Sequence, residues 1–430
     1  MRVFIQNGHI IDPSQGIDGA GDIFIEHGKI KEITLRNREQ KAKGREGRQI
    51  ERHIDAGGLT VFPGLIDMHV HLREPGFEHK ETISTGTLAA IKGGFTTVCC
   101  MPNTFPVNDN ASVTEFIKRK ASQEGYCTVL PIGAITKGQR GEELAEIGTM
   151  RKEGCIAFSD DGHPVMSSLI MRRALEYSRA FDVPVISHCE DLTLSEEGVM
   201  NEGIMSVTLG LKGIPAEAEQ IMIFRDILLA ELTGGRLHIA HVSTAGSVQL
   251  IRSAKSRGIS VTAETCPHYF SITEEAVKGY DTNAKVSPPL RTWHDVEAIR
   301  EGLRDGTIDV IATDHAPHHR DEKMREFDMA PFGISGLETA VSLSLNLVEQ
   351  GILTTSQLVE KMALNPARIL RIAKGTMKPG SDADIVLIDS GKEFTVEADR
   401  FISKGKNTPF QGWNLRGKPI LTICRGKIHE

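Results

Sequence analysis

Two histidines separated by one valine, His69 and His71, stand at the end of an apolar run that begins at Pro63. The run suits a buried strand, in which residues two apart point to the same side. The two imidazoles would then lie next to each other and could bind one metal ion through neutral nitrogen atoms. Taken alone, the pattern is equally compatible with two structural histidines, so the rest of the chain has to decide.

Residues that can bind a metal ion or a polar substrate also stand where other predicted strands end. They are Asn103, Asp160, Asp161, His188, His241 and Asp314. So many ligand-type residues at matching positions are hard to explain as structural residues alone. Nitrogen and oxygen ligands without thiolate favour Zn²⁺, with Mn²⁺ or Co²⁺ as replacements.

The predicted ligand set is larger than one tetrahedral zinc ion requires. It comprises His69, His71, Asp161, His188, His241 and Asp314. Two metal ions that share a bridging carboxylate fit better, and such a pair lowers the pKa of bound water towards ~7. The predicted chemistry is therefore metal-assisted hydrolysis by hydroxide. Asp314 ends the last strand and is the best candidate to pass a proton from the hydroxide to the leaving nitrogen.

A repeated alternation of strands and helices would position these residues. Strand-like runs open near Val61, Phe95, Cys127, Cys155, Val183, Leu237, Ile259 and Ile308. Helical runs between them include 81–91, 112–124, 167–179, 217–232, 246–257 and 294–303. Eight repeats predict an α/β fold, a closed (β/α)₈ TIM-like barrel over residues 59–374 with its chemistry at the carboxyl ends of the strands. Short strands in residues 1–58 and 375–430 predict a small β-sandwich domain formed by both termini.

Composition limits the partners and the compartment. A net charge of −7 argues against nucleic acid or an anionic membrane as a partner. The seven cysteines form no Cys-x-x-Cys pair and most lie in strand-like runs, which indicates core thiols in a reducing compartment. The first residues turn polar too early for a signal peptide, and no apolar run approaches the length of a membrane span. We therefore expect a cytoplasmic protein.

The strand-end motifs resemble the amidohydrolase superfamily and, more narrowly, the type I dihydroorotases. The likeness rests on HVHLREPG, MPNT, FSDDG, SHCED, HVST and TDHAPH, and it covers nearly the whole chain, including the divided β-domain. It implies a zinc-dependent, reversible cyclisation of N-carbamoyl-L-aspartate to (S)-dihydroorotate with loss of water. That reaction is the third step of pyrimidine biosynthesis.

The resemblance also implies roles for individual residues. His69 and His71 would hold the first metal ion, His188 and His241 the second, and Asp161 would bridge the two. Asp314 would be both a ligand and the catalytic acid and base. The implied substrate-binding residues are His71, Arg73, Asn103, Ser287, His318, Phe332 and Gly333.

Two features depart from patterns found among relatives. Ser287 stands where many relatives have Asn before Pro-Pro-Leu-Arg, and its shorter hydroxyl reaches less far. In several related cyclic amidohydrolases a carbamylated lysine bridges the metals where this chain has Asp161, so occupancy by one metal ion stays open. Asp160 is an alternative to Asp161, although Gly162 and the family pattern favour Asp161.

Arg73 bears on the choice of substrate. It lies two residues beyond His71 on the same strand face, and its planar fork suits a bidentate contact with a carboxylate. A rim salt bridge with Glu74 or Glu78 is the structural alternative. A hydantoin has no carboxylate and would leave Arg73 unpaired.

Two other functions remain open from the sequence. One is a different cyclic amidase, either an allantoinase or a hydantoinase-like enzyme. The other is a non-catalytic barrel that serves as a scaffold for aspartate transcarbamoylase, although the complete ligand set counts against it. A complex of an active enzyme with aspartate transcarbamoylase is implied for some members of the family, and a homodimer is also open. The charged segment 320–331 lacks strand or helix periodicity and is a candidate lid.

Overall fold

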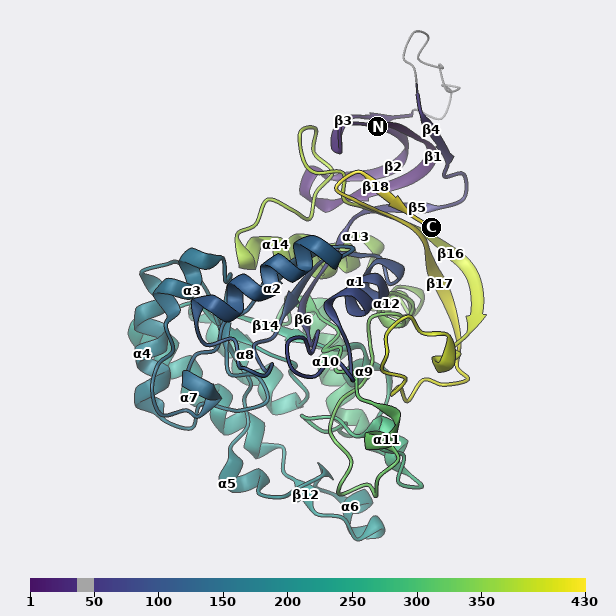
Figure 1. The fold of residues 1–430 in the computed structure, drawn as a ribbon. Coiled ribbons are helices and arrows are strands. Elements are labelled where there is room, and N and C mark those ends of the chain that lie inside the picture. Colours follow the sequence, from purple (N-terminus) through teal and green to yellow (C-terminus); the bar gives the residue numbers. More distant parts are fainter. Residues whose placement is uncertain (37–49) are drawn as a thin grey trace.

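The computed structural model describes residues 1–36 and 50–430 and has an α/β fold. In one part, helices surround short parallel strands; in the other, a sheet contains both ends of the chain (Figure 1). The predicted α/β class with parallel sheets is confirmed. The parallel strands matter most for function, because the candidate site lies where they end.

Strands from both termini share one eight-stranded sheet, ordered β18-β17-β16-β5-β1-β2-β3 with β4 paired to β1. The strands are β1 (Arg2–Asp12), β2 (Ile17–Glu26), β3 (Lys29–Leu35), β4 (Arg52–Asp55), β5 (Thr60–Pro63), β16 (Ile385–Thr395), β17 (Asn414–Cys424) and β18 (Lys427–His429). The two ends of the chain meet in the antiparallel pair β5–β16, where Val61 opposes Leu387. Side chains from both ends, including Ile5 and Ile385, form one buried cluster.

The parallel strands form two hydrogen-bonded sheets, β6-β7-β8 and β15-β14-β13-β10-β9. They are β6 (Leu65–Val70), β7 (Phe95–Cys100), β8 (Thr128–Pro131), β9 (Phe158–Ser159), β10 (Val185–Ser187), β13 (Leu237–Ile239), β14 (Val261–Thr265) and β15 (Val310–Ile311). Isolated parallel bridges link the two sheets at both edges, Gly133 with Phe158 and Val70 with His315. One apolar cluster also spans both sheets.

The first parallel strand opens later than predicted, at Leu65 rather than near Val61. The run is divided because residues Thr60–Pro63 pair with β1 and β16 of the terminal sheet. Between the two strands, Gly64 lies so close to Thr96 that an added Cβ would stand 2.2 Å from the Thr96 hydroxyl oxygen. A residue without a side chain is therefore required where the chain passes from one sheet to the other.

Each of the six predicted helical runs corresponds to an observed helix. These are α1 (Ile83–Lys92), α2 (Ala111–Glu124), α4 (Ser168–Arg179), α7 (Glu217–Thr233), α8 (Ala245–Ser256) and α10 (Trp293–Asp305). Helices without a predicted counterpart are α3 (Ile147–Glu153), α5 (Leu192–Ser195), α6 (Ile204–Leu209), α9 (Pro267–Ser271), α11 (Arg320–Lys323), α12 (Ala340–Glu349), α13 (Thr355–Val359), the π-helix Glu360–Leu364 and α14 (Asn365–Leu370). Most are too short for a periodic signal, and α12 is buried on nearly all sides, so it has no polar face.

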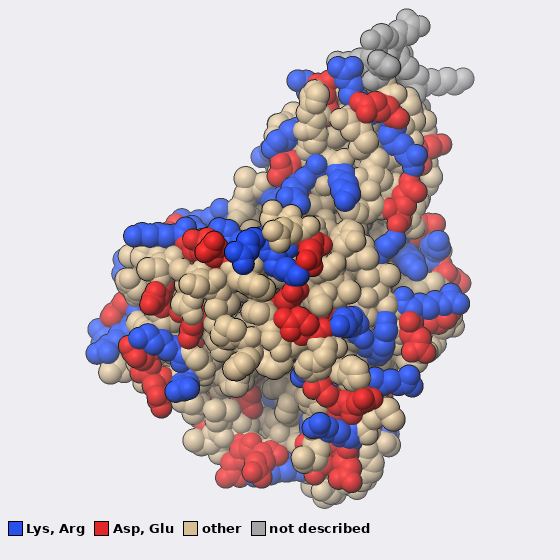
Figure 2. Space-filling view, in the orientation of Figure 1, with Lys and Arg blue, Asp and Glu red and all other residues tan. Residues whose placement is uncertain are grey.

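The strands β11 (Met200–Asn201) and β12 (Gly213–Ile214) form a separate pair beside α6. Lysine, arginine and acidic side chains are interspersed over the face of the molecule in Figure 2. Across residues 1–36 and 50–430, no helix is both long and apolar enough to cross a membrane. All seven cysteines lie in these ranges, and each is a buried free thiol.

Candidate metal centre and substrate pocket

The predicted metal ligands converge at the carboxyl ends of five parallel strands. His69 lies in β6 and His71 just beyond it, while the others follow β9, β10, β13 and β15. Ligand atoms of His69, His71 and Asp161 all lie within 4.8 Å of one another, and so do those of Asp161, His188 and His241. Asp161 thus belongs to two groups that could each hold a metal ion.

Asp161 occupies the centre of the cluster. Its Oδ1 lies 3.3 Å from His69 Nε2, 3.5 Å from His241 Nε2 and 3.6 Å from His188 Nδ1. Its Oδ2 lies 3.4 Å from His71 Nε2. The alternative acid, Asp160, points elsewhere, because its carboxylate accepts hydrogen bonds from the backbone N–H groups of Ile135 and Thr136. The structure therefore brings Asp161, and not Asp160, to the histidines.

Asp314 lies beside His69 and His71, the predicted ligands of the first metal ion. Its Oδ1 is 3.1 Å from His71 Nε2 and 3.4 Å from His69 Nε2. The backbone of Asp314 has a φ of 48°, and that of His241 has a φ of 33°. Positive φ is costly for residues with a side chain and is often found at functional sites, where the surrounding structure holds it in place.

The donor set fits a metal ion. His69 Nε2 and Asp161 Oδ1 are buried atoms without a hydrogen-bond partner among the residues that the structure describes. A buried polar atom without a partner costs free energy, and coordination to a metal ion would satisfy both atoms. Imidazole nitrogens and carboxylate oxygens are the ligands that zinc accepts in catalytic sites.

The charges of the cluster favour a cation at its centre. Burial lowers the pKa of His69, but the carboxylates of Asp161 and Asp314 outweigh burial and raise it well above its usual value. Burial raises the pKa of Asp161, but the charge of His69 and the nearby imidazoles of His188 and His241 hold it well below its usual range. The carboxylates of Asp161 and Asp314, whose pKa is also lowered, therefore stay ionised and attract positive charge to the centre of the cluster.

Carboxylates orient two of the histidines through hydrogen bonds. His69 Nδ1 lies 2.6 Å from Glu264 Oε1, and the other oxygen of Glu264 lies 3.1 Å from His238 Nε2. His188 Nε2 lies 3.1 Å from Glu190 Oε2. Because an ionised carboxylate only accepts, the nitrogen that faces it carries the proton and the opposite nitrogen is left for the metal. We did not single out these acids from the sequence, although Glu264 is the one charged residue of strand β14.

A cavity of about 420 Å³ opens beside the cluster. All seven predicted substrate-binding residues line it: His71, Arg73, Asn103, Ser287, His318, Phe332 and Gly333. Asp161, His188, His241 and Asp314 also reach its wall, whereas His69 is fully buried. Glu190 lines the cavity as well and lies 3.4 Å from the Ser287 hydroxyl oxygen.

Arg73 is held in this cavity by neutral groups. Its Nε donates to Pro317 O at 3.2 Å, and one terminal nitrogen lies 3.3 Å from His318 Nε2. Burial lowers its pKa to about 10, so the guanidinium stays charged at neutral pH. The alternative rim salt bridge is not formed. Glu74 instead faces Lys120, and the Glu78 carboxylate accepts from the backbone of Gly76.

His318 joins two segments of the cavity wall. Its Nε2 lies 2.8 Å from Phe332 O, and its Nδ1 lies 3.5 Å from Glu322 Oε2. Burial and the neighbouring charges of Arg73 and Lys80 hold its pKa well below the usual value, so the ring is neutral. The candidate lid 320–331 begins with helix α11, which its sequence did not predict, and its last residue, Pro331, lines the cavity.

Comparison with known proteins adds an independent line of evidence. Residues 58–247 match the family model described as "Dihydro-orotase-like". A dihydroorotase of Geobacter metallireducens is 58% identical over 100% of this chain and 99% of its own length. A dihydroorotase of Syntrophus aciditrophicus is 54% identical over the same shares.

Solved structures are similar over almost the whole chain. An L-hydantoinase (dihydropyrimidinase) from Arthrobacter aurescens matches with a TM-score of 0.88 at 28% identity, covering 99% of this chain and 95% of that one. A D-hydantoinase matches with a TM-score of 0.84 at 27% identity, covering 100% of this chain and 95% of that one.

Proposed function

The chain belongs to the dihydroorotase family and is an enzyme of pyrimidine synthesis that acts on cyclic amides, and on this premise we propose how its residues carry out the reaction. The reaction interconverts N-carbamoyl-L-aspartate and (S)-dihydroorotate, with water lost on ring closure. The observation that carries the proposal is the place of Arg73, a partly buried cation whose Nε donates to the Pro317 carbonyl, in the same cavity as the histidine and aspartate cluster.

His69 and His71 would hold one zinc ion, and His188 and His241 a second, with Asp161 shared between them. This assignment is supported by the two groups of ligand atoms, each within 4.8 Å. Bound zinc would lower the pKa of water and so supply hydroxide as a nucleophile at neutral pH. Asp314 would complete the ligand set, since its Oδ1 lies 3.1 Å from His71 Nε2.

Asp314 would also move the proton of the reaction. In ring opening, hydroxide attacks the ring carbonyl carbon, Asp314 accepts the hydroxide proton and donates it to the amide nitrogen, and the carbon–nitrogen bond breaks. A carboxylate is released, and ring closure is the reverse. Although burial raises the pKa of Asp314, the charges of His69 and His71 lower it below its usual value, so the group starts as a carboxylate and can accept a proton.

The substrate carboxylate would lie against Arg73 and Asn103. The Asn103 side-chain oxygen lies 2.8 Å from His71 Nδ1, so its amide nitrogen is the atom that would donate to the substrate. His318, whose Nε2 lies 2.8 Å from Phe332 O and donates to it, would line the pocket on the same side as Arg73. Ser287 and the backbone of Phe332 and Gly333 would contact the ring.

Neighbouring functions are less well supported. The solved hydantoinases share the fold of this chain, but hydantoin itself has no carboxylate for Arg73 to bind. A non-catalytic scaffold for aspartate transcarbamoylase would not need a complete cluster of ligands. A complex with aspartate transcarbamoylase, a homodimer and a cytoplasmic location remain predictions, as does the choice of zinc over other divalent metals.

We also propose that the eight parallel strands close into a (β/α)₈ barrel and that the terminal sheet folds over its own core as a small sandwich. The bridges Gly133–Phe158 and Val70–His315, one at each edge, support closure. The cluster that contains Ile5 and Ile385 supports the sandwich. Residues 59–374 would form the barrel domain, flanked in sequence by 1–58 and 375–430.

A direct assay tests the function. The purified protein is given dihydroorotate, allantoin and hydantoin in parallel, and ring opening is followed for each. We expect turnover of dihydroorotate at a kcat/KM at least tenfold above that for either other substrate. Turnover of hydantoin or allantoin without dihydroorotate would contradict the proposal.

A further inference from the structure

The connection between β16 and β17, residues 396–413, leaves the terminal sheet and reaches the wall of the substrate cavity. We call these residues the strap. Its two ends are joined by backbone hydrogen bonds, from Val396 N to Trp413 O at 2.8 Å and from Gly412 N to Val396 O at 2.9 Å. The strap is therefore a closed loop, held at its base and free to project away from the sheet.

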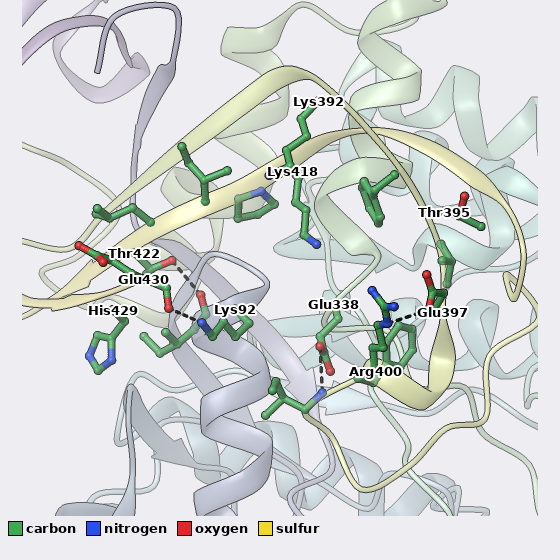
Figure 3. A pocket seen from close by; sticks show the side chains of 18 residues that line it. Lys92, Glu338, Lys392, Thr395, Glu397, Arg400, Lys418, Thr422, His429 and Glu430 are labelled. Carbon is green, nitrogen blue, oxygen red and sulfur yellow. Dashed lines mark hydrogen bonds and ion pairs between the residues drawn. The ribbon is translucent and has the colours of Figure 1, made fainter. Parts of the chain in front are cut away.

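The outer side of the strap borders a second cavity, of about 490 Å³, which also lies against the β16–β17 hairpin and α1 (Figure 3). There the Glu338 carboxylate accepts hydrogen bonds from Ile402 N at 3.0 Å and Ser403 N at 3.1 Å. These bonds fix the middle of the strap to the segment that precedes α12. The next residues of the strap then turn to the substrate cavity.

Asn407, in the second half of the strap, bonds to both segments that form one wall of that cavity. Its amide nitrogen donates to Ala316 O at 3.0 Å and to Gly333 O at 2.9 Å. Its side-chain oxygen accepts from His318 N at 3.0 Å and from the Ser335 hydroxyl at 3.0 Å. The side chain is 2% exposed, and both of its N–H groups and both lone pairs are used.

The two segments connected in this way carry proposed functional groups. One runs from Asp314 to His318, and the other contains Phe332 and Gly333. The backbone carbonyl of Asn407 also accepts from Ser335 N at 2.7 Å. A single residue of the C-terminal part of the chain thus bonds to both segments, which are also joined directly where Ala316 N donates to Ile334 O at 2.9 Å.

The strap and the two wall segments are packed so closely that their spacing can change little. An added Cβ at Gly333, where φ is 143°, would lie 2.7 Å from Ala316 O. An added Cβ at Gly405 of the strap would lie 2.5 Å from the Pro317 Cβ. The strap and the two wall segments therefore touch backbone to backbone, and a shift in the strap is passed directly to the wall.

We propose that Asn407 is a positioning residue that fixes the spacing of the Asp314–His318 and Phe332–Gly333 segments and thereby the fit of the substrate. The inference rests on the proposed function of that wall. It assigns a role at the reaction site to a segment that belongs by sequence to the terminal β-domain. Asn407 touches neither the cluster nor the cavity, so it acts only through the residues that it binds.

The sharpest test replaces Asn407 with aspartate, which has the same shape. A carboxylate cannot donate to Ala316 O and Gly333 O, and it places a negative charge beside these two carbonyl oxygens. For Asn407→Asp we expect KM for dihydroorotate to rise about tenfold or more with kcat changed less than about threefold, since binding geometry is lost while the cluster is intact. Zinc content should equal that of the wild type.

Asn414→Asp is the matched control, because Asn414 is exposed at the start of β17 and lies outside the site. It should keep the wild-type KM. Ser335→Ala, which removes one hydrogen bond to Asn407, should raise KM about fivefold, the factor that corresponds to the roughly 1 kcal/mol of one neutral hydrogen bond. If Asn407→Asp does not fold, the Ser335→Ala result alone decides.

The two proposals fail in different ways. A wild-type protein that does not open dihydroorotate overturns the proposed function, whatever the variants do. A wild-type protein that is active, with Asn407→Asp or Ser335→Ala showing the wild-type KM, overturns the positioning role alone. A fall in melting temperature with unchanged KM counts as that second outcome, because it indicates a purely structural residue.

Discussion

His69 Nδ1 lies 2.6 Å from Glu264 Oε1, and both side chains are fully buried. The carboxylate fixes the proton on Nδ1 and turns Nε2 towards Asp161 and Asp314. Glu264 has a second partner, His238, whose own Nδ1 lies 2.8 Å from the Thr262 hydroxyl oxygen. The orientation of the first ligand is thus set by a chain of hydrogen bonds that leads away from the cavity into the core.

Glu264→Gln should weaken metal binding. The new amide oxygen can still accept from His69, but the side chain is neutral. Its amide nitrogen would face His238 Nε2 in place of the second carboxylate oxygen. We expect metal affinity to fall by roughly 10–100-fold, as is usual when the partner of a metal-binding histidine is lost. Metal content after dialysis against graded chelator measures this, with the exposed Glu275→Gln as control. Equal retention of metal in both variants would show that Glu264 does not orient a ligand.

Arg73→Lys should separate carboxylate recognition from catalysis. Lysine keeps the charge but lacks the planar fork, so we expect KM for dihydroorotate to rise by about ten- to a hundredfold, worth ~1.4–2.8 kcal/mol of binding. Any residual turnover of hydantoin should change little, because hydantoin has no carboxylate. Steady-state kinetics with both substrates measures the difference. If the substitution weakened the kinetics of dihydroorotate and hydantoin by the same factor, the role given to Arg73 would be contradicted.

Asp314→Asn should retain metal and lose turnover. The amide cannot accept and return a proton, so kcat should fall by about 10²–10⁴-fold, the range for loss of a general acid or base. Metal content is expected to stay close to that of the wild type, because the two groups that share Asp161 do not include Asp314. Near-normal turnover by this variant would require another residue as the base.

The position of equilibrium should depend on pH. Ring opening releases a carboxyl group and, above its pKa of roughly 4, one proton per turnover, so each added pH unit should favour the open form about tenfold. Acid should favour ring closure for the same reason. The ratio of the two compounds at equilibrium between pH 5 and 9 measures the slope. A ratio independent of pH would mean that the substrate is not a cyclic amide opened to an acid.

Much of the site could be predicted from the sequence because ligands in parallel α/β folds follow the strands directly. His69, His71, Asp161, His188 and His241 each stand at or just after a short apolar run, and the structure brings them within a few ångströms of one another. Their strands are brief; β9 and β15 have two residues each. The predictable quantity was therefore the position of the strand end and not the length of the strand.

The groups that support the site could not be predicted in the same way. Glu264 lies within a strand and Asn407 in an irregular segment, so neither follows a pattern that indicates chemistry. Their partners, His69 and His318, are 195 and 89 residues distant in the sequence. The division of the run near Val61 depended likewise on a distant strand, β16, which pairs with β5. Contacts of this kind become visible only in the folded chain.

The most direct test of the account measures zinc per chain and dihydroorotate turnover on one preparation, before and after chelation. We expect one or two zinc ions per chain, loss of turnover when they are removed, and its return when zinc is added. Full turnover by metal-free protein, or no turnover by protein that holds zinc, would contradict a hydrolase built on the cluster around Asp161.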